Sequence, residues 1–193
     1  GRLLPKYQGR YQAHPIDEWQ KEFEVAKEIE LDCIEFILDY NNAIENPLLK
    51  EEGIKQIKSV IAKTGVTVKT ICADYFMEAP LHSKNFTEGV KSQKIMETLL
   101  YNAAQLGVSD VVLPCVDQSK LHDKKTTDRF INMITPLVII AERLGVNLSL
   151  ETDLAPYPFA SLLKQCNSSR VTVNYDIGNS ASLGYDPVEE LDS

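Results

Sequence analysis

The stretch VNLSLE, residues 146–151, is a short run of apolar and β-branched residues that ends on an acid. A second run of this kind, VTVNYD, occupies residues 171–176. Both runs predict buried β-strands. An acid that ends a buried strand needs a partner or a ligand. If strands and helices alternate along the chain, Glu151 and Asp176 lie together at one edge of a parallel sheet, an arrangement that favours a metal site.

Three junctions in the chain share one pattern, in which a helical segment ends at a glycine and a β-rich segment follows. The glycines are Gly65, Gly107 and Gly145, and glycine commonly ends a helix in the left-handed conformation. Pro136 predicts a kink or a late start in the fourth helix. We expect strands at residues 32–38, 66–72, 110–114, 146–151 and 171–176, and helices at residues 17–30, 46–64, 87–106, 127–144 and 157–166.

Alternating strands and helices predict an α/β fold with right-handed crossovers, either an open doubly wound sheet or a (β/α)8 TIM barrel. The chain lacks a G-x-G-x-x-G motif, which argues against a dinucleotide-binding sheet. Polar residues lie at or near the end of every expected strand, as at the mouth of a barrel enzyme. They are Glu35 and Asp39, Asp74 and Tyr75, Cys115 and Asp117, Glu151 and Asp153, then Asp176 and Asn179.

The composition is that of one globular domain, with 44% hydrophobic and 25% charged residues among 193. The net charge of −8 and the lack of basic runs argue against nucleic acid as a partner. No apolar run approaches the length of a membrane helix, and the first residues do not have the layout of a signal peptide. The four cysteines are widely spaced, which predicts reduced, buried thiols. We therefore expect a cytoplasmic protein without a membrane partner.

Several motifs, taken in order, resemble one family along the whole chain. Together they are similar to the xylose isomerase-like TIM-barrel superfamily, in particular its sugar and sugar-phosphate epimerase/isomerase branch. The motifs are GRL at residues 1–3, Trp19, DCIEF at 32–36, CADYFM at 72–77, LGV at 144–146 leading to Glu151, and YDIGN at 175–179.

The resemblance implies a metal site shared among four strand ends. Members of the family bind one divalent cation through a Glu ending the fifth strand, an Asp ending the sixth, a His ending the seventh and a Glu ending the eighth. By motif, the first two roles fall on Glu151 and Asp176, and such oxygen ligands suit Mn²⁺ or Mg²⁺. The other two ligands would lie beyond Ser193. We therefore expect residues 1–193 to form a single, incomplete barrel, about strands 2 to 6 with their helices, which is either a fragment of a longer enzyme or is completed by other material.

The activity that the resemblance implies is a divalent-metal-dependent sugar or sugar-phosphate epimerase or isomerase. Such enzymes remove a proton next to a carbonyl group through a metal-stabilised enediolate. Glu151 would be both a metal ligand and one of two acid/base groups. The substrate would be a small sugar or sugar phosphate, and a homodimer is expected because barrel enzymes of this kind often form dimers.

Three further residues are candidates for substrate binding, each with a structural alternative. Asn179 occupies a position where relatives place a residue that contacts a substrate hydroxyl, but it could equally bond the local turn. Glu35 could bind the sugar at the mouth, or it could be a surface or ion-paired residue at the strand end. His82 could meet the substrate, although a solvated loop histidine is the default interpretation. Asp176 has the alternative role of an N-cap for the turn that follows it.

Two competing functions are weighed against the epimerase. A non-catalytic barrel could bind a sugar or an inositol-like ligand without turning it over. An apurinic endonuclease-like metalloenzyme would need several histidines at strand ends, whereas this chain has three histidines in all and an acidic balance of charge. We expect His14 and His122 to lie on the surface. The endonuclease is therefore the least favoured of the three.

Overall fold

The computed structural model describes residues 3–192, and its centre is a five-stranded parallel sheet. The strands lie in sequential order and are β1 (Cys33–Ile37), β2 (Thr67–Cys72), β3 (Asp110–Cys115), β4 (Asn147–Thr152) and β5 (Val171–Val173). The helices are α1 (Gln20–Glu28), α2 (Glu51–Thr64), α3 (Tyr75–Glu78), α4 (Phe86–Leu106), α5 (Lys124–Leu144), α6 (Pro156–Cys166), α7 (Ile177–Leu183) and α8 (Pro187–Asp192). Three short 3-10 helices, η1 (Ala43–Glu45), η2 (Pro47–Leu49) and η3 (Asp117–Ser119), complete the elements.

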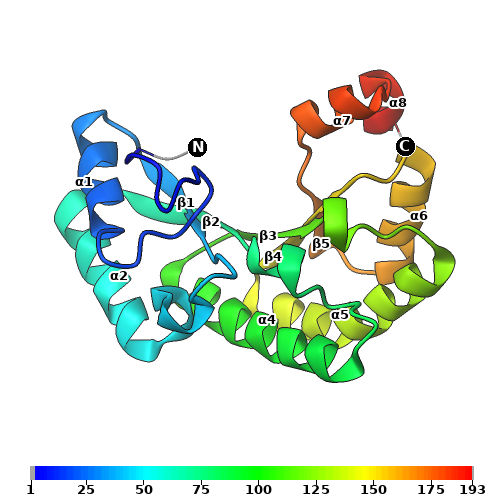
Figure 1. Cartoon of the computed structure of the whole chain (residues 1–193), viewed down its shortest axis with the longest axis horizontal. Coiled ribbons are helices and arrows are strands. Elements are labelled where there is room, and N and C mark those ends of the chain that lie inside the picture. The colour runs from blue at the N-terminus through cyan, green and yellow to red at the C-terminus, as the bar shows by residue number, and fades with distance from the viewer. Residues whose placement is uncertain (1–2, 193) are drawn as a thin grey trace.

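The sheet is covered on one side and open on the other. Figure 1 shows α1, α2, α4, α5 and α6 along the outer side, while the opposite side opens between the N-terminal segment and the pair α7 and α8. Sequential parallel strands with helices on one side are the architecture of a TIM barrel. The prediction of an incomplete (β/α)8 barrel is confirmed.

Alternation along the strands places apolar side chains under the helices and polar ones on the open side. Leu148 and Leu150 of β4 are fully buried in the core. The residue between them, Ser149, bonds side chains of both neighbouring strands, at 3.0 Å from Asp110 Oδ1 and 2.8 Å from Thr172 Oγ1. The inner face is therefore linked by polar side chains, and it carries the site described below.

The expected strand and helix junctions are confirmed in position. Gly65, Gly107 and Gly145 follow α2, α4 and α5 with φ angles of 80°, 73° and 72°, in the left-handed region that glycine enters without strain. All four cysteines are free thiols, as expected, but the expected burial holds for Cys115 alone, and Cys33 is exposed. None of the helices in the described part of the chain has the length and apolar character that a membrane crossing needs.

Four expected boundaries are wrong by three residues or more. Helix α1 begins at Gln20 rather than residue 17, and α2 begins at Glu51 rather than residue 46. Helix α5 does not start late but begins three residues before the predicted position and passes through Pro136. Its early start follows from Asp123, whose side chain accepts a hydrogen bond from the Thr126 amide at 2.7 Å and so caps the helix. Strand β5 ends at Val173 rather than residue 176, because the chain then turns into α7.

Candidate active site

Glu151 is held at the carboxyl end of β4 by two amide side chains. Its Oε2 accepts a hydrogen bond from Asn174 Nδ2 and its Oε1 accepts one from Asn179 Nδ2, both at 2.9 Å. The side chain is half-buried. Because each carboxylate oxygen has its own donor, the two amides fix the orientation of the group.

Asp176 lies just beyond β5 and caps α7. Its Oδ1 accepts a hydrogen bond from the backbone N–H of Asn179 at 3.0 Å, so the N-cap interpretation is confirmed. Asn179 thus donates to both acids, through its backbone to Asp176 and through its side chain to Glu151. The two acids lie at the same edge of the sheet, where the strand-end argument places them.

Burial is the main cause that raises the pKa of Glu151 above its ordinary value. The negative charges of Asp176 and Glu35 raise it further, while the hydrogen bonds from Asn174 and Asn179 oppose the shift. Glu151 is therefore a carboxylate with more basic character than an exposed glutamate, and it lies within the electrostatic reach of two other acids.

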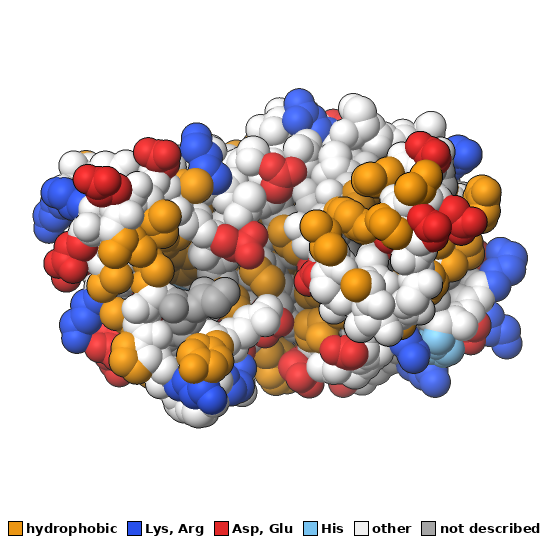
Figure 2. Space-filling model, turned by 90° about the horizontal axis from the view of Figure 1, so that it is seen from above, with side chains coloured by type: hydrophobic (Ala, Val, Ile, Leu, Met, Phe, Trp, Pro, Cys, Tyr) orange, Lys and Arg blue, Asp and Glu red, His pale blue; other side chains and the backbone are white. Residues whose placement is uncertain are grey.

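The open side of the sheet forms a hollow of about 620 Å³ that reaches Glu151. Glu151, Asn174 and Asp176 line one side of it, and Gln12 and Glu35 are among the residues that line the other. Figure 2, which views the molecule from above, shows acidic side chains in the middle of this face and most lysines and arginines around its edge. A second hollow of about 460 Å³ also touches Glu151 and Asp176 and extends beneath α6 and α8.

Glu35 faces the larger hollow from β1. Its Oε2 accepts a hydrogen bond from Thr70 Oγ1 of the neighbouring strand at 2.7 Å, and the side chain is otherwise exposed. No described lysine or arginine forms an ion pair with it, so within residues 3–192 the ion-paired alternative is not what the structure shows, while its exposure agrees with the alternative of a surface residue. Glu35 is free to present its second oxygen to a ligand.

The histidines are placed differently from expectation. His82 is only 6% exposed, packs edge-on to Phe130 with 5.8 Å between ring centroids, and lines neither hollow. Burial lowers its pKa to about 4. The structure therefore does not bring His82 together with the other candidates, and the solvated-loop interpretation is also wrong. His14 is 4% exposed, against the expectation of a surface residue, because its ring packs on Phe36; His122 is exposed as expected.

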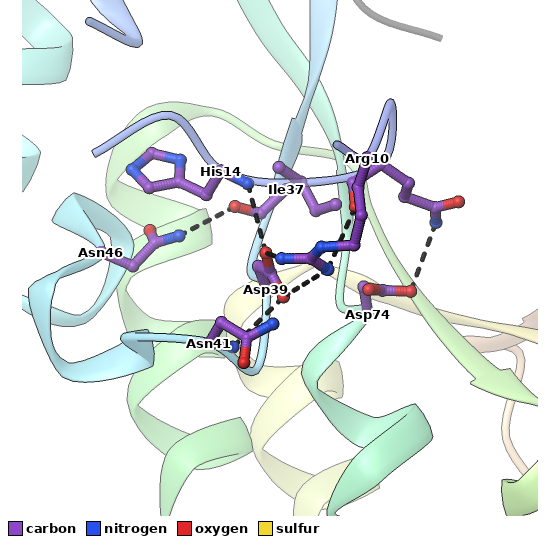
Figure 3. Close-up of polar contacts among 8 residues, drawn as sticks. Arg10, His14, Ile37, Asp39, Asn41, Asn46 and Asp74 are labelled. Carbon is purple, nitrogen blue, oxygen red and sulfur yellow. Dashed lines mark hydrogen bonds and ion pairs between the residues drawn. The ribbon is translucent and has the colours of Figure 1, made fainter. Parts of the chain in front are cut away.

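Sequence reasoning missed a network that attaches the N-terminal segment to the ends of β1 and β2. Arg10 donates to Asp39 through its two terminal guanidinium nitrogens, Nη1 at 3.3 Å and Nη2 at 2.7 Å, and Asp39 is 3% exposed. Asp39 also accepts hydrogen bonds from the backbone N–H groups of His14 and Asn41, at 3.4 and 3.2 Å. Figure 3 shows Arg10 lying between Asp39 and Asp74. The segment that carries Gln12 into the hollow is thereby fixed in place.

Gln12 extends this network to β2. Its Nε2 donates to Asp74 Oδ1 at 3.3 Å and lies 3.6 Å from Cys72 Sγ. Burial, together with the charge of Asp39, raises the pKa of Asp74 to about 6. Burial is also the main cause that raises the pKa of Cys72 to about 12, so this thiol is protonated and is a weak nucleophile at neutral pH.

A family model for the xylose isomerase-like TIM barrel matches residues 23–192. The chain belongs to this family. A putative L-ribulose-5-phosphate 3-epimerase of Haemophilus influenzae is 28% identical over 183 residues, which are 90% of this chain and 63% of the relative. A probable L-ribulose-5-phosphate 3-epimerase of Mycoplasma pneumoniae is 22% identical over 180 residues, 90% of this chain and 59% of the relative. The chain thus spans about 60% of the length of these curated relatives.

Solved members of the xylose isomerase-like family share the fold. A D-tagatose 3-epimerase-like protein superposes with a TM-score of 0.74 at 17% identity, covering 92% of this chain and 67% of the other. A family protein from Mycobacterium smegmatis in complex with magnesium gives a TM-score of 0.65 at 20% identity, covering 89% of this chain and 60% of the other. At these identities the likeness establishes the architecture, and the chemistry has to be argued from the side chains.

The chemistry of Glu151 and Asp176 fits part of a divalent-cation site. Carboxylate oxygens are hard donors that Mg²⁺ and Mn²⁺ prefer. Burial is the main cause that raises the pKa of Glu151, and the negative charge of Asp176 adds to the shift, so a cation beside both acids would favour their charged forms. Two carboxylates are fewer than the roughly six ligands of such an ion. Within residues 3–192 no group of three or more His, Cys, Asp or Glu side chains has a metal-binding arrangement. Water, substrate or other residues would have to complete the shell.

Proposed function

We propose that this chain is part of a sugar or sugar-phosphate epimerase or isomerase that exchanges a proton on the carbon next to a carbonyl group. The observation that carries the proposal is the carboxylate of Glu151, which is oriented by two amides at the wall of a hollow of about 620 Å³. The naming of both curated relatives as L-ribulose-5-phosphate 3-epimerases supports the same class of reaction.

Glu151 is the proposed base. Its half-buried position makes it a stronger proton acceptor than an exposed glutamate, and Asn174 and Asn179 hold it in one orientation. An oriented base within reach of the substrate removes much of the entropic cost of proton transfer. Asn179 acts as a positioning residue for Glu151, because its side-chain amide already donates to the carboxylate; this is a different role from the hydroxyl contact first expected.

Glu151 and Asp176 are also the proposed protein ligands of a divalent cation, Mn²⁺ or Mg²⁺. When bound, such an ion stabilises the negative charge that develops on the substrate oxygen. Asn179 donates a hydrogen bond to each acid and would hold the two carboxylates in a fixed arrangement around the ion. Glu35, on the opposite wall, is proposed to bind a substrate hydroxyl. Cytoplasmic location and dimer formation stay predictions from the sequence.

The test is exchange of the substrate's α-proton with solvent, measured by NMR in D₂O on the full-length protein with a ketose as substrate. Glu151→Gln keeps the shape of the side chain and is expected to slow exchange by about 10²- to 10⁴-fold, the range of a lost general base. Glu97→Gln, an exposed position on α4, is the matched control and should exchange as the wild type does. Undiminished exchange in Glu151→Gln would remove this residue from the mechanism. A wild type that binds the sugar without exchange would support the non-catalytic barrel.

A further inference from the structure

The N-terminal segment, residues 3–15, forms one wall of the larger hollow. Leu3 and every residue from 11 to 15 line it, and Figure 1 shows the segment across the opening from α7 and α8. The segment precedes α1, and its backbone forms an isolated bridge between Tyr7 and Arg10. A terminal segment keeps one conformation only where contacts with the rest of the domain tie it down. Those contacts therefore decide which side chain the segment presents to the hollow.

Asp39 holds the segment on both sides of Gln12. The guanidinium group of Arg10 donates to this carboxylate through Nη1 and Nη2, and the backbone N–H of His14 donates to it at 3.4 Å (Figure 3). Because Asp39 is only 3% exposed, both contacts are made to a buried group that water can hardly replace. Gln12 lies midway between the two attachment points, and its exposed side chain lines the hollow. The backbone at Gln12 is therefore fixed by contacts that Gln12 itself does not make.

The side-chain amide of Gln12 is also held in one orientation. Its Nε2 donates to Asp74 Oδ1 at 3.3 Å and lies 3.6 Å from Cys72 Sγ. An ionised carboxylate only accepts hydrogen bonds, so Asp74 fixes which end of the amide faces it, and Oε1 of Gln12 is directed away as an acceptor. Ordering a glutamine side chain costs about 1.5 to 2 kcal/mol of rotamer freedom. A ligand that binds an amide already ordered by the protein does not have to meet this cost.

Cys72 connects Gln12 with the proposed base. The thiol lies beside the Gln12 amide and lines the same hollow as Glu151. Burial is the main cause that raises the pKa of Cys72, and the negative charge of Glu151 adds to the shift, so the two side chains are within electrostatic reach of each other. One small molecule in the hollow can therefore meet Glu151 at one end and Gln12 at the other.

Resting on the proposed function, we infer that Gln12 is a substrate-binding residue, whose Oε1 accepts a hydrogen bond from a hydroxyl group of the sugar while Glu151 faces the reacting carbon. An acceptor fixed in this way recognises a hydrogen-bond donor at one position of the ligand. Arg10 and Asp39 are positioning residues that act through Gln12, because they hold the segment that carries it.

The test measures binding and exchange separately on the full-length protein, with a ketopentose as the probe. Calorimetry gives Kd, and exchange of the α-proton gives kcat and KM. Gln12→Leu removes the amide and keeps much of its volume. We expect it to raise Kd and KM about three- to tenfold, the factor of one hydrogen bond between neutral groups, and to change kcat less than about twofold. The matched control Gln56→Leu, at an exposed position on α2, should leave Kd, KM and kcat as in the wild type.

The two measurements separate the inference from the proposed function. An unchanged Kd and KM in Gln12→Leu, with exchange intact, would overturn the inference and leave the proposed function in place. A wild type that binds the ketopentose without exchanging its α-proton would overturn the proposed function, and the Kd of Gln12→Leu would still decide whether Gln12 binds the sugar.

A double-mutant cycle tests the positioning role of Arg10. Arg10→Lys keeps the positive charge beside Asp39 but loses the two parallel hydrogen bonds of the guanidinium group. We expect it to raise Kd about threefold when Gln12 is present and to raise it no further in Gln12→Leu, because residues that act through one contact are not additive. A general loss of stability would not depend on Gln12 in this way. No effect of Arg10→Lys, or the same factor in both backgrounds, would overturn the role of Arg10 as a positioning residue for Gln12.

Discussion

Replacement of Asp39 by Asn tests how firmly the N-terminal segment is held. The carboxylate of Asp39 is 3% exposed, and it accepts one strong charge-assisted bond from Arg10 at 2.7 Å and three longer ones at 3.2 to 3.4 Å. Asn keeps the shape and one acceptor but loses the charge, and it places an amide N–H₂ among groups that are all donors. The short bond alone is worth about 1.5 to 3 kcal/mol.

The total loss of stability in Asp39→Asn is expected to be smaller than for a completely buried ion pair, because Arg10 is 38% exposed and water can solvate it in the variant. Breaking a buried pair costs about 3 to 5 kcal/mol. We therefore expect Asp39→Asn to lower the free energy of unfolding by about 2 to 3 kcal/mol. Urea unfolding should show a lower midpoint with an unchanged slope, since the native surface is nearly the same.

The matched control for this prediction is Asp128→Asn. Asp128 also pairs with a cation through both oxygens, at 2.9 Å from Lys124 Nζ, but the pair is on the surface of α5 with side chains 47% and 85% exposed. An exposed ion pair between residues four positions apart on a helix contributes about 0.3 to 0.5 kcal/mol to stability. If Asp39→Asn costs no more than Asp128→Asn, the reasoning that burial makes the Asp39 network strong is refuted.

Two further perturbations test the packing and the electrostatics. In Gly53→Ala the new Cβ would lie 2.2 Å from the carbonyl oxygen of Pro47. Because this neighbour is backbone and cannot easily move, we expect the free energy of unfolding in urea to fall by about 2 to 3 kcal/mol. The exposed control Ser59→Ala on the same helix should change it by less than about 0.5 kcal/mol, and equal effects of the two substitutions would contradict the close contact. The folded protein raises the pKa of Asp74 to about 6, so the native state binds more protons than the unfolded state below that pH, and this group's contribution to stability falls as pH rises from about 4 to 6. The free energy of unfolding of Asp74→Asn should therefore exceed that of the wild type at pH 7 by about 1 kcal/mol after allowance for solvent screening. This difference in stability should shrink toward pH 4, and a difference that does not change with pH would disprove the raised pKa of Asp74.

The sheet and helices could be predicted because their signals are local. A helix that ends at Gly65, Gly107 or Gly145 and an apolar run that follows are both visible within about ten residues, and the strand-end rule then places Glu151 and Asp176 at one edge. Local signals also explain the wrong boundaries. The Asp123 cap extends α5 against the expectation drawn from Pro136.

The parts that escaped prediction depend on contacts between distant residues. Asn174 was missed as a partner of Glu151, although its place in the alternation Thr172, Asn174, Asp176 puts it on the inner face. The pairing of Arg10 with Asp39 joins residues 29 apart through a loop that carries no periodic pattern. The burial of His82 likewise follows from Phe130, which lies on α5 far along the chain.

Titration of the full-length protein with Mn²⁺, followed by electron paramagnetic resonance, tests most directly whether Glu151 and Asp176 bind one ion together. Loss of a residue that only supports a ligand weakens metal binding by about 10- to 100-fold, so loss of a ligand should cost at least that much. We expect Glu151→Gln and Asp176→Asn each to weaken Mn²⁺ binding at least about tenfold, while Asp153→Asn, which lines neither hollow, binds as the wild type does. Wild-type affinity in both Glu151→Gln and Asp176→Asn would contradict the shared metal site.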